Sequence, residues 1–110
     1  MGAAITINDE NFIAEIQTHV GVALVDFGAT WCAPCQALAP TIEELADDWA
    51  DKGVKIAKCD IDEASDLAAQ FGIMSVPTIV FFKDGEKLET LLGNQPKAAL
   101  QSKIESLVAG

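Results

Sequence analysis

The sequence predicts an α/β fold in which a central five-stranded mixed β-sheet is flanked by four α-helices. Three observations lead to this prediction: five short apolar runs have the length of strands, apolar residues recur with helical spacing between most of these runs, and an Asp-Gly turn joins the last two. The chain has 110 residues, of which 50% are hydrophobic, enough for one core. We therefore expect a single domain over residues 1–110.

The strands are expected where β-branched and aromatic residues concentrate, at residues 4–7, 22–27, 54–59, 78–82 and 87–92. The Asp84-Gly85 pair indicates a tight hairpin, so the last two strands should be antiparallel. Helices separate the earlier strands, which we therefore expect to run parallel with right-handed crossovers.

Each expected helix carries an apolar stripe with a spacing of three or four residues. The stripes are Phe12, Ile16 and Val20 in the first helix, Leu38, Ile42, Leu45, Ala46 and Trp49 in the second, Ala64, Leu67, Ala68 and Phe71 in the third, and Leu100, Ile104, Leu107 and Val108 in the fourth. Asn8 or Asp9 is a capping candidate for the first helix, and Pro96 lies near the start of the fourth.

The second helix should span about residues 32–50. Its apolar stripe, extended backward, includes Cys35. Cys35 should therefore face the core, whereas Cys32 should lie exposed at the start of the helix.

Charge and apolar content limit the expected partners and location. Seventeen acidic and seven basic residues give a formal net charge of -10, which repels nucleic acid and anionic membranes. The first twelve residues lack the basic start and the long apolar run of a secretory signal, and no apolar stretch has membrane-spanning length. We expect a cytoplasmic monomer that binds neither nucleic acid nor membranes.

The segment TWCAPCQ, residues 30–36, places two cysteines three positions apart. As a structural disulfide they would close a loop of four residues, which stabilises a fold by only about 2 kcal/mol. As a zinc site they would need two further ligands, and the chain offers only Cys59 and His19, which form no second closely spaced pair. Neither the disulfide staple nor the metal site accounts well for this spacing.

Redox chemistry suits the paired cysteines better. The N-terminus of a helix presents free N–H groups and a partial positive charge, which favour a thiolate, so Cys32 is the candidate nucleophile. Residues three apart on a helix are neighbours, so Cys35 can attack a mixed disulfide formed at Cys32. Pro34, in the first turn, needs no N–H there and stiffens the link between the two cysteines.

Four segments extend this pattern across the chain, and with them the sequence resembles the thioredoxin family. They are VDFGATWCAPCQALAP at 25–40, KCDID at 58–62, FGIMSVPTIVFFKDG at 71–85 and LLGN at 91–94. The resemblance implies the thioredoxin fold and a protein-disulfide reductase that acts on target proteins through Cys32 and Cys35. It also implies an electron carrier that is re-reduced by a thioredoxin reductase. No cofactor is expected in this chain, which has no glycine-rich nucleotide loop.

The resemblance also implies supporting residues. Asp26 lies in an apolar strand, where burial should raise the pKa of its carboxyl group, and the family places there an acid that assists deprotonation of the second cysteine, with Lys58 nearby. A cis bond is expected between Val76 and Pro77. An apolar surface for extended protein segments would be formed by Trp31, Ala33, Pro34, Val76, Pro77 and Gly93.

Three residues depart from the usual family pattern around the cysteines. Gly28 replaces a common tryptophan, Ala33 replaces the glycine between the cysteines, and Gln36 replaces a frequent cation. The redox potential and the preferred partners depend on this neighbourhood. Two other functions remain compatible with the sequence: an oxidant or isomerase with the same fold, and a non-catalytic docking module that uses the surface around Trp31.

Overall fold

The structure, a computed structural model, describes residues 4–110. This part of the chain forms a five-stranded mixed sheet with the strand order β1-β3-β2-β4-β5. The strands are β1 (Ile5–Ile7), β2 (Val22–Gly28), β3 (Lys55–Asp60), β4 (Thr78–Lys83) and β5 (Glu86–Leu92). The helices are η1 (Ile13–Gln17), α1 (Ala33–Trp49), α2 (Ser65–Gln70) and α3 (Lys97–Ala109). The predicted sheet of five strands and the predicted four helices are thus confirmed within residues 4–110.

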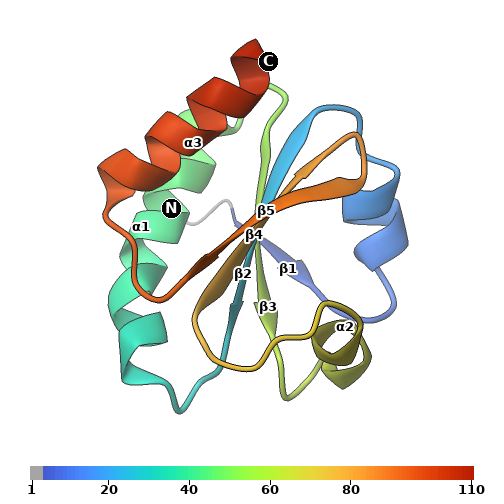
Figure 1. The fold of residues 1–110 in the computed structure, drawn as a ribbon, viewed down its shortest axis with the longest axis vertical. Coiled ribbons are helices and arrows are strands. Elements are labelled where there is room, and N and C mark those ends of the chain that lie inside the picture. The colour runs from blue at the N-terminus through green and yellow to red at the C-terminus, as the bar shows by residue number, and fades with distance from the viewer. Residues whose placement is uncertain (1–3) are drawn as a thin grey trace.

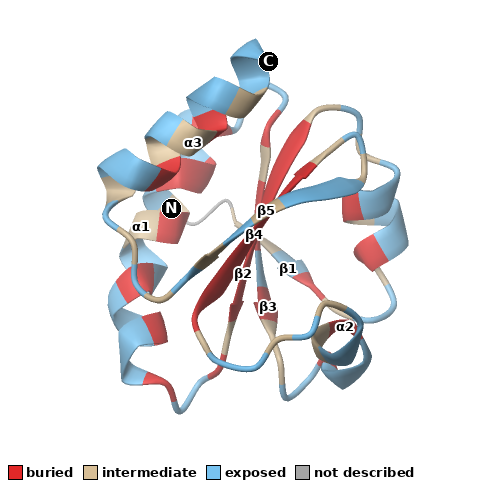
Figure 2. Ribbon diagram, viewed as in Figure 1, coloured by how far each residue is buried: buried red, intermediate tan, exposed pale blue. Residues whose placement is uncertain are grey.

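The helices cover both faces of the sheet. Figure 1 shows α1 and α3 on one side of the strands and η1 and α2 on the other. Two apolar layers result, one against α1 and α3 and one against η1 and α2. Strand β2 lies in the middle of the sheet and is buried over most of its length (Figure 2), so it contributes to both layers. Within residues 4–110, no helix has both the length and the hydropathy needed to cross a membrane.

The direction of β4 differs from the prediction. Strands β1, β3 and β2 are parallel, but β4 pairs with β2 in the antiparallel sense, with Thr78 opposite Phe27. The reason is the length of α2, whose six residues rise about 9 Å, whereas a six-residue strand spans about 20 Å. Helix α2 is therefore too short to carry the chain back along the sheet, and β4 begins at the end of the sheet where β3 stops.

The hairpin between β4 and β5 agrees with the sequence. Asp84 and Gly85 have positive φ values of 52° and 83°, the conformation of a tight turn that suits right-handed strand twist. Strands β4 and β5 are antiparallel, as expected.

Helix η1 is shorter than its predicted stripe. It is a π-helix that ends at Gln17, and the chain then turns through Gly21, whose φ is 109°. Phe12 and Ile16 are buried, but Val20 lies in the turn with its side chain 83% exposed. The expectation that Val20 continues the buried stripe was therefore wrong, because the helix ends before it.

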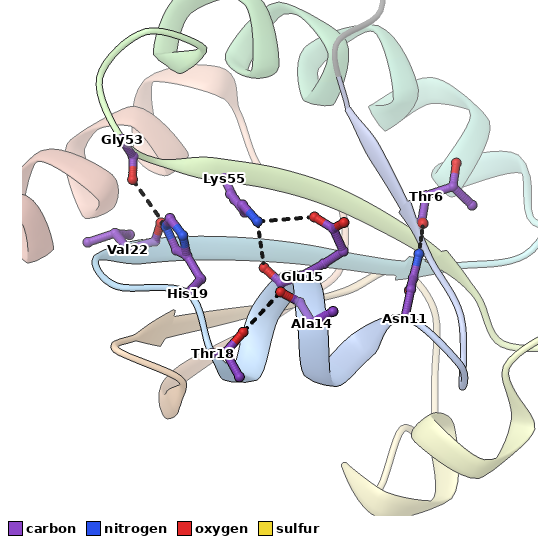
Figure 3. A network of polar contacts seen from close by, with 9 residues as sticks. All are labelled: Thr6, Asn11, Ala14, Glu15, Thr18, His19, Val22, Gly53 and Lys55. Carbon is purple, nitrogen blue, oxygen red and sulfur yellow. Dashed lines mark hydrogen bonds and ion pairs between the residues drawn. The ribbon is translucent and has the colours of Figure 1, made fainter.

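Polar contacts hold η1 against β3 and the loop before it (Figure 3). The Lys55 ammonium group donates to the main-chain oxygen of Glu15 at 3.1 Å and to its carboxylate at 3.0 Å. His19 Nε2 lies 3.2 Å from Val22 O and 3.1 Å from Gly53 O, so its ring bridges the start of β2 and the loop before β3. The lysine contact gives the main-chain oxygen of Glu15 in this short helix a hydrogen-bond partner.

Asp9 does not serve the helix for which it was a capping candidate. The carboxylate of Asp9 does not cap η1 and instead accepts a hydrogen bond from the main-chain N–H of Leu67, in the first turn of α2. Pro96 itself is the N-cap of α3. In α3, Leu100 and Ile104 are buried, whereas Val108 is half exposed in the last turn.

Helix α1 matches the sequence most closely. It spans Ala33–Trp49, within one residue of the predicted bounds at each end. Its buried residues are Cys35, Leu38, Ile42, Leu45, Ala46 and Trp49, which are the residues of the predicted stripe. The hydrophobic face of α1 therefore fixes which way the second cysteine points.

Candidate active site

The site is built at the start of α1, where the chain leaves the end of β2. Cys32 is the N-cap residue and Cys35 lies in the first turn, with Pro34 between them. The two cysteines form a disulfide, with their Cα atoms 5.2 Å apart. The main-chain N–H of Cys35 donates to the sulfur of Cys32 at 3.1 Å. A free N–H group at the start of the helix therefore contacts the Cys32 sulfur directly.

Cys32 is less exposed than the sequence suggested. Its residue exposure is 5%, compared with 8% for Cys35, so the prediction of an exposed Cys32 was wrong for this disulfide form. Both cysteines pack together with Ala29, Ile61 and Val76. The bond to Cys35, which faces the core, draws the sulfur of Cys32 inward, and the loop containing Val76 covers it.

The loop before β4 lies against the disulfide. The Val76–Pro77 peptide bond is cis, as expected. The main-chain oxygen of Val76 lies 3.7 Å from the sulfur of Cys32. Gly93, with a φ of 81°, donates its N–H to Pro77 O at 2.9 Å, which joins the end of β5 to this loop.

Asp26 is buried in β2, behind the cysteines. It is 8% exposed, Ile79 of β4 lies opposite it in the sheet, and its Oδ1 atom has no hydrogen-bond partner within residues 4–110. Burial raises the pKa of the Asp26 carboxyl group from 3.8 to about 6. The rise in pKa expected from burial in an apolar strand is confirmed.

A cavity connects Asp26 to Cys35. Its volume is about 380 Å³, and Gly28 and Lys58 also line it. A Cβ atom on Gly28 would lie 3.3 Å from the sulfur of Cys35, so the missing side chain at this position leaves the cavity wall open beside that sulfur. Asp26 and Cys35 thus line the same cavity.

Lys58 is beside Asp26 in the sheet, yet its ammonium group pairs with a different carboxylate. The two residues are register partners in parallel strands β2 and β3. The Lys58 ammonium group makes an ion pair at 3.1 Å with Glu43 of α1. Sequence reasoning missed Glu43, and no local signal identifies it, because the contact depends on how α1 packs across β3.

The residues of the expected apolar surface are unequally exposed. Trp31 is 67% exposed, with its Nε1–H donating to the Asp62 carboxylate at 2.8 Å. Ala33 and Pro34 are exposed and Val76 is half-buried, whereas Pro77 is buried. Met74, which the sequence analysis did not single out, is 95% exposed in the same loop as Val76. Its closeness in sequence to Pro77 was the available signal.

Gln36 and Cys59 have distinct local roles. The Gln36 side chain donates to Thr30 O at 2.7 Å and so braces the loop that carries Trp31. Cys59 is a free, buried cysteine, and the pKa of its thiol is raised to about 12, first by burial and then by nearby carboxylates. Cys59 therefore remains a neutral thiol at physiological pH and is a poor nucleophile.

Comparison with known proteins agrees with this geometry. The Thioredoxin family model matches residues 3–106. The chain belongs to the thioredoxin family. A thioredoxin from Staphylococcus saprophyticus is 48% identical over 103 residues, which are 94% of this chain and 96% of that protein. A thioredoxin from Bacillus subtilis is 46% identical over 102 residues, which are 93% of this chain and 95% of that protein.

The fold agrees as well. A mutant thioredoxin from Halobacterium salinarum has a solved structure that superposes with a TM-score of 0.85 at 35% identity, covering 98% of this chain and 95% of that chain. Thioredoxins are protein-disulfide oxidoreductases, and this chain carries the family's pair of cysteines joined as a disulfide. It is a dithiol redox protein of that class.

Proposed function

We propose that the protein reduces disulfide bonds in other proteins through Cys32 and Cys35 and is then re-reduced by a thioredoxin reductase. The observation that supports this most directly is the position of the Cys32 sulfur, which is bonded to Cys35 and accepts the Cys35 N–H at the start of α1. The same N–H stabilises negative charge on that sulfur once the disulfide is reduced.

In the first step the Cys32 thiolate attacks one sulfur of a target disulfide. A bond forms between Cys32 and the target, the target's own disulfide breaks, and one target sulfur leaves as a thiolate that takes up a proton. Cys35, which lies next to Cys32 in the first turn of α1, remains a thiol during this step.

In the second step Cys35 attacks the Cys32 sulfur. The Cys35 proton passes to the Asp26 carboxylate through the cavity that the two residues share, and the second target sulfur leaves as a thiolate. Two electrons have then moved from the dithiol to the target, and the Cys32–Cys35 disulfide is the product. Asp26 acts here as the general base, and the sulfur atoms carry the electrons without a cofactor or a metal.

The target is held beside the cysteines by main-chain and apolar contacts. The Val76 oxygen faces the Cys32 sulfur, and the exposed side chains of Trp31 and Pro34 adjoin it in sequence. We propose that an extended target segment lies over Trp31, Ala33, Pro34, Val76 and Gly93, with Pro77 supporting this surface from beneath. Such a surface accepts many sequences, because it makes few side-chain hydrogen bonds.

The proposal extends to the setting of the reaction. We infer a single domain over residues 1–110 that works as a monomer in the cytoplasm, with thioredoxin reductase and disulfide-containing proteins as its partners. The net charge of -10 is consistent with a protein that avoids nucleic acid and anionic membranes.

The test compares the three cysteines one at a time. With a disulfide-bonded peptide as substrate and purified bacterial thioredoxin reductase with NADPH, we expect Cys32→Ser to abolish turnover. Cys35→Ser should accumulate a peptide adduct on Cys32, detectable by mass spectrometry, and Cys59→Ala serves as the control that retains turnover. Undiminished activity of Cys32→Ser would show a docking module instead. An equilibrium potential against glutathione near that of strong oxidants would show an oxidase or isomerase instead.

A further inference from the structure

We propose that Glu43 is a positioning residue for proton transfer at Asp26, because it holds the Lys58 ammonium group away from the Asp26 carboxylate. This inference rests on the proposed role of Asp26 as the base for Cys35. It assigns a task to a residue that lies outside the redox motif and touches neither sulfur.

The first step of the argument is that Lys58 and Asp26 point to the same side of the sheet. They are register partners in adjacent parallel strands, which lie about 4.8 Å apart. Leu24 and Ile56, two residues earlier in the same strands, both pack in the layer against α1 and α3. Side chains alternate along a strand, so Asp26 and Lys58 face α1 as well.

The second step is that Glu43, on α1, binds the Lys58 ammonium group. Its carboxylate accepts one hydrogen bond from the Lys58 ammonium group at 3.1 Å and one from the main-chain N–H of Ala4 at 3.2 Å. Burial alone would raise the pKa of Glu43, but these two hydrogen bonds lower it below its usual value. Glu43 therefore stays ionised over the working pH range and remains a partner for the lysine.

The third step concerns the charges around Asp26. The titratable residues that line its cavity are Cys35 from α1, Lys58, Cys59 and Asp60 from β3, and Glu63 from the following turn, while β4 places the apolar Ile79 opposite Asp26. Lys58 is the only cation among the described residues that line this cavity. It is therefore the only group there that could stabilise the Asp26 carboxylate by direct pairing.

The consequence is a competition for one ammonium group. A cation paired with Asp26 would stabilise its ionised form and make it a weaker base. With Lys58 held by Glu43, the Oδ1 atom of the Asp26 carboxylate has no hydrogen-bond partner among residues 4–110, and the carboxylate keeps a high affinity for the proton of Cys35. The position of Glu43 on α1, one face of which carries Cys35, ties this arrangement to the helix that bears the cysteines.

The test measures Asp26 directly. In the reduced protein, NMR titration of the Asp26 carboxyl carbon should move toward acid by about one pH unit or more in Glu43→Gln. The pH at which resolution of a mixed disulfide on Cys32 reaches half its maximal rate should move in the same direction. At neutral pH, the resolution rate should fall several-fold.

Two further variants separate positioning from simple charge removal. Glu44→Gln, at the next residue of α1, removes the same charge from an ion pair with Lys97 and should leave the Asp26 titration unchanged. In a Lys58→Gln background, Glu43→Gln should have no effect on Asp26. If the shift persists in that background, Glu43 acts through its own charge and the proposal is overturned.

The failures of the two proposals are distinguishable. If Asp26 titrates alike in the wild type and in Glu43→Gln, the positioning role of Glu43 is wrong, whatever Asp26 does in catalysis. If Asp26→Asn resolves mixed disulfides at the wild-type rate, the base role of Asp26 is wrong, and with it the catalytic purpose of Glu43.

Discussion

Asp26 is the residue at which chemistry and stability oppose each other. A carboxyl group with a pKa of about 6 is a useful base near neutral pH, but above that pH the fold must hold an ionised group in an apolar layer. The unfolded chain carries the same charge in water at no such cost. The protein therefore gives up some of its stability at the position where we propose the base for Cys35.

The first prediction follows from the sign of this shift. The folded pKa lies above the ordinary 3.8, so between that value and about 6 the folded state binds a proton that the unfolded state lacks. Stability contributed by Asp26 is present at low pH and is lost as pH rises through about 6. At pH 7, Asp26→Asn should raise the free energy of unfolding by about 3 kcal/mol.

Urea denaturation at several pH values checks this prediction. The gain from Asp26→Asn should shrink as pH falls from 7 to 4, while the exposed Glu105→Gln should change little at any pH. A gain that stays constant with pH would mean that the benefit comes from packing and not from the buried charge.

Among the elements, the β4–β5 hairpin depends on its docking against η1. Gly85 has a φ of 83°, and a Cβ atom there would overlap the main-chain oxygen of Gln17, the last residue of η1. Gly53 has a similar φ of 75°, but nothing lies near the position of its Cβ. Both glycines thus have a positive φ, but only Gly85 lies in close contact with another segment of the main chain.

The second prediction uses this matched pair. Gly53→Ala should cost about 1–2 kcal/mol, the strain of a left-handed backbone. Gly85→Ala should cost a further ~1–3 kcal/mol, because η1 or the hairpin must move to make room. The difference in unfolding free energy between the two variants is the measurement, and equal costs would show that the contact with Gln17 yields without strain.

The sequence predicted most helices and strands, but not where each helix ends or in which direction each strand runs. The stripe of α1 was sufficient because each of its members packs against one sheet face. Val20 was misplaced because periodicity does not reveal where a short helix stops. The direction of β4 could not be read from the presence of a helix before it, since it depends on whether that helix is long enough to cross the sheet.

For the molecule as a whole, the net charge of -10 acts on every encounter with a target. Three acidic residues lie at the end of β3 and just after it: Asp60, Asp62 and Glu63. The ring N–H of Trp31 donates a hydrogen bond to the Asp62 carboxylate, which places this acidic segment beside Trp31. Charge of one sign over a surface speeds the approach of oppositely charged partners and slows that of like-charged ones.

The third prediction concerns two peptides with the same disulfide, one flanked by lysines and one by glutamates. At about 0.01 M salt, where the screening length is about 30 Å, the lysine peptide should be reduced several-fold faster by the dithiol form. At about 1 M salt, where that length is about 3 Å, the two rates should converge. Stopped-flow measurements at both salt concentrations decide the matter, and a preference that salt does not weaken would point to specific contacts instead.

The amino-acid sequence by itself determined the local chemistry of this protein. Cys32 and Cys35 lie three positions apart at the start of a helix, Asp26 sits in a buried strand, and Asp84-Gly85 makes the hairpin, because each of these depends on neighbours along the chain. Only the tertiary structure decided the cover over Cys32, the cavity between Asp26 and Cys35, and the pairing of Lys58 with Glu43. Those features join residues from different elements, and their distances are set by how helix and sheet pack, which no local pattern records.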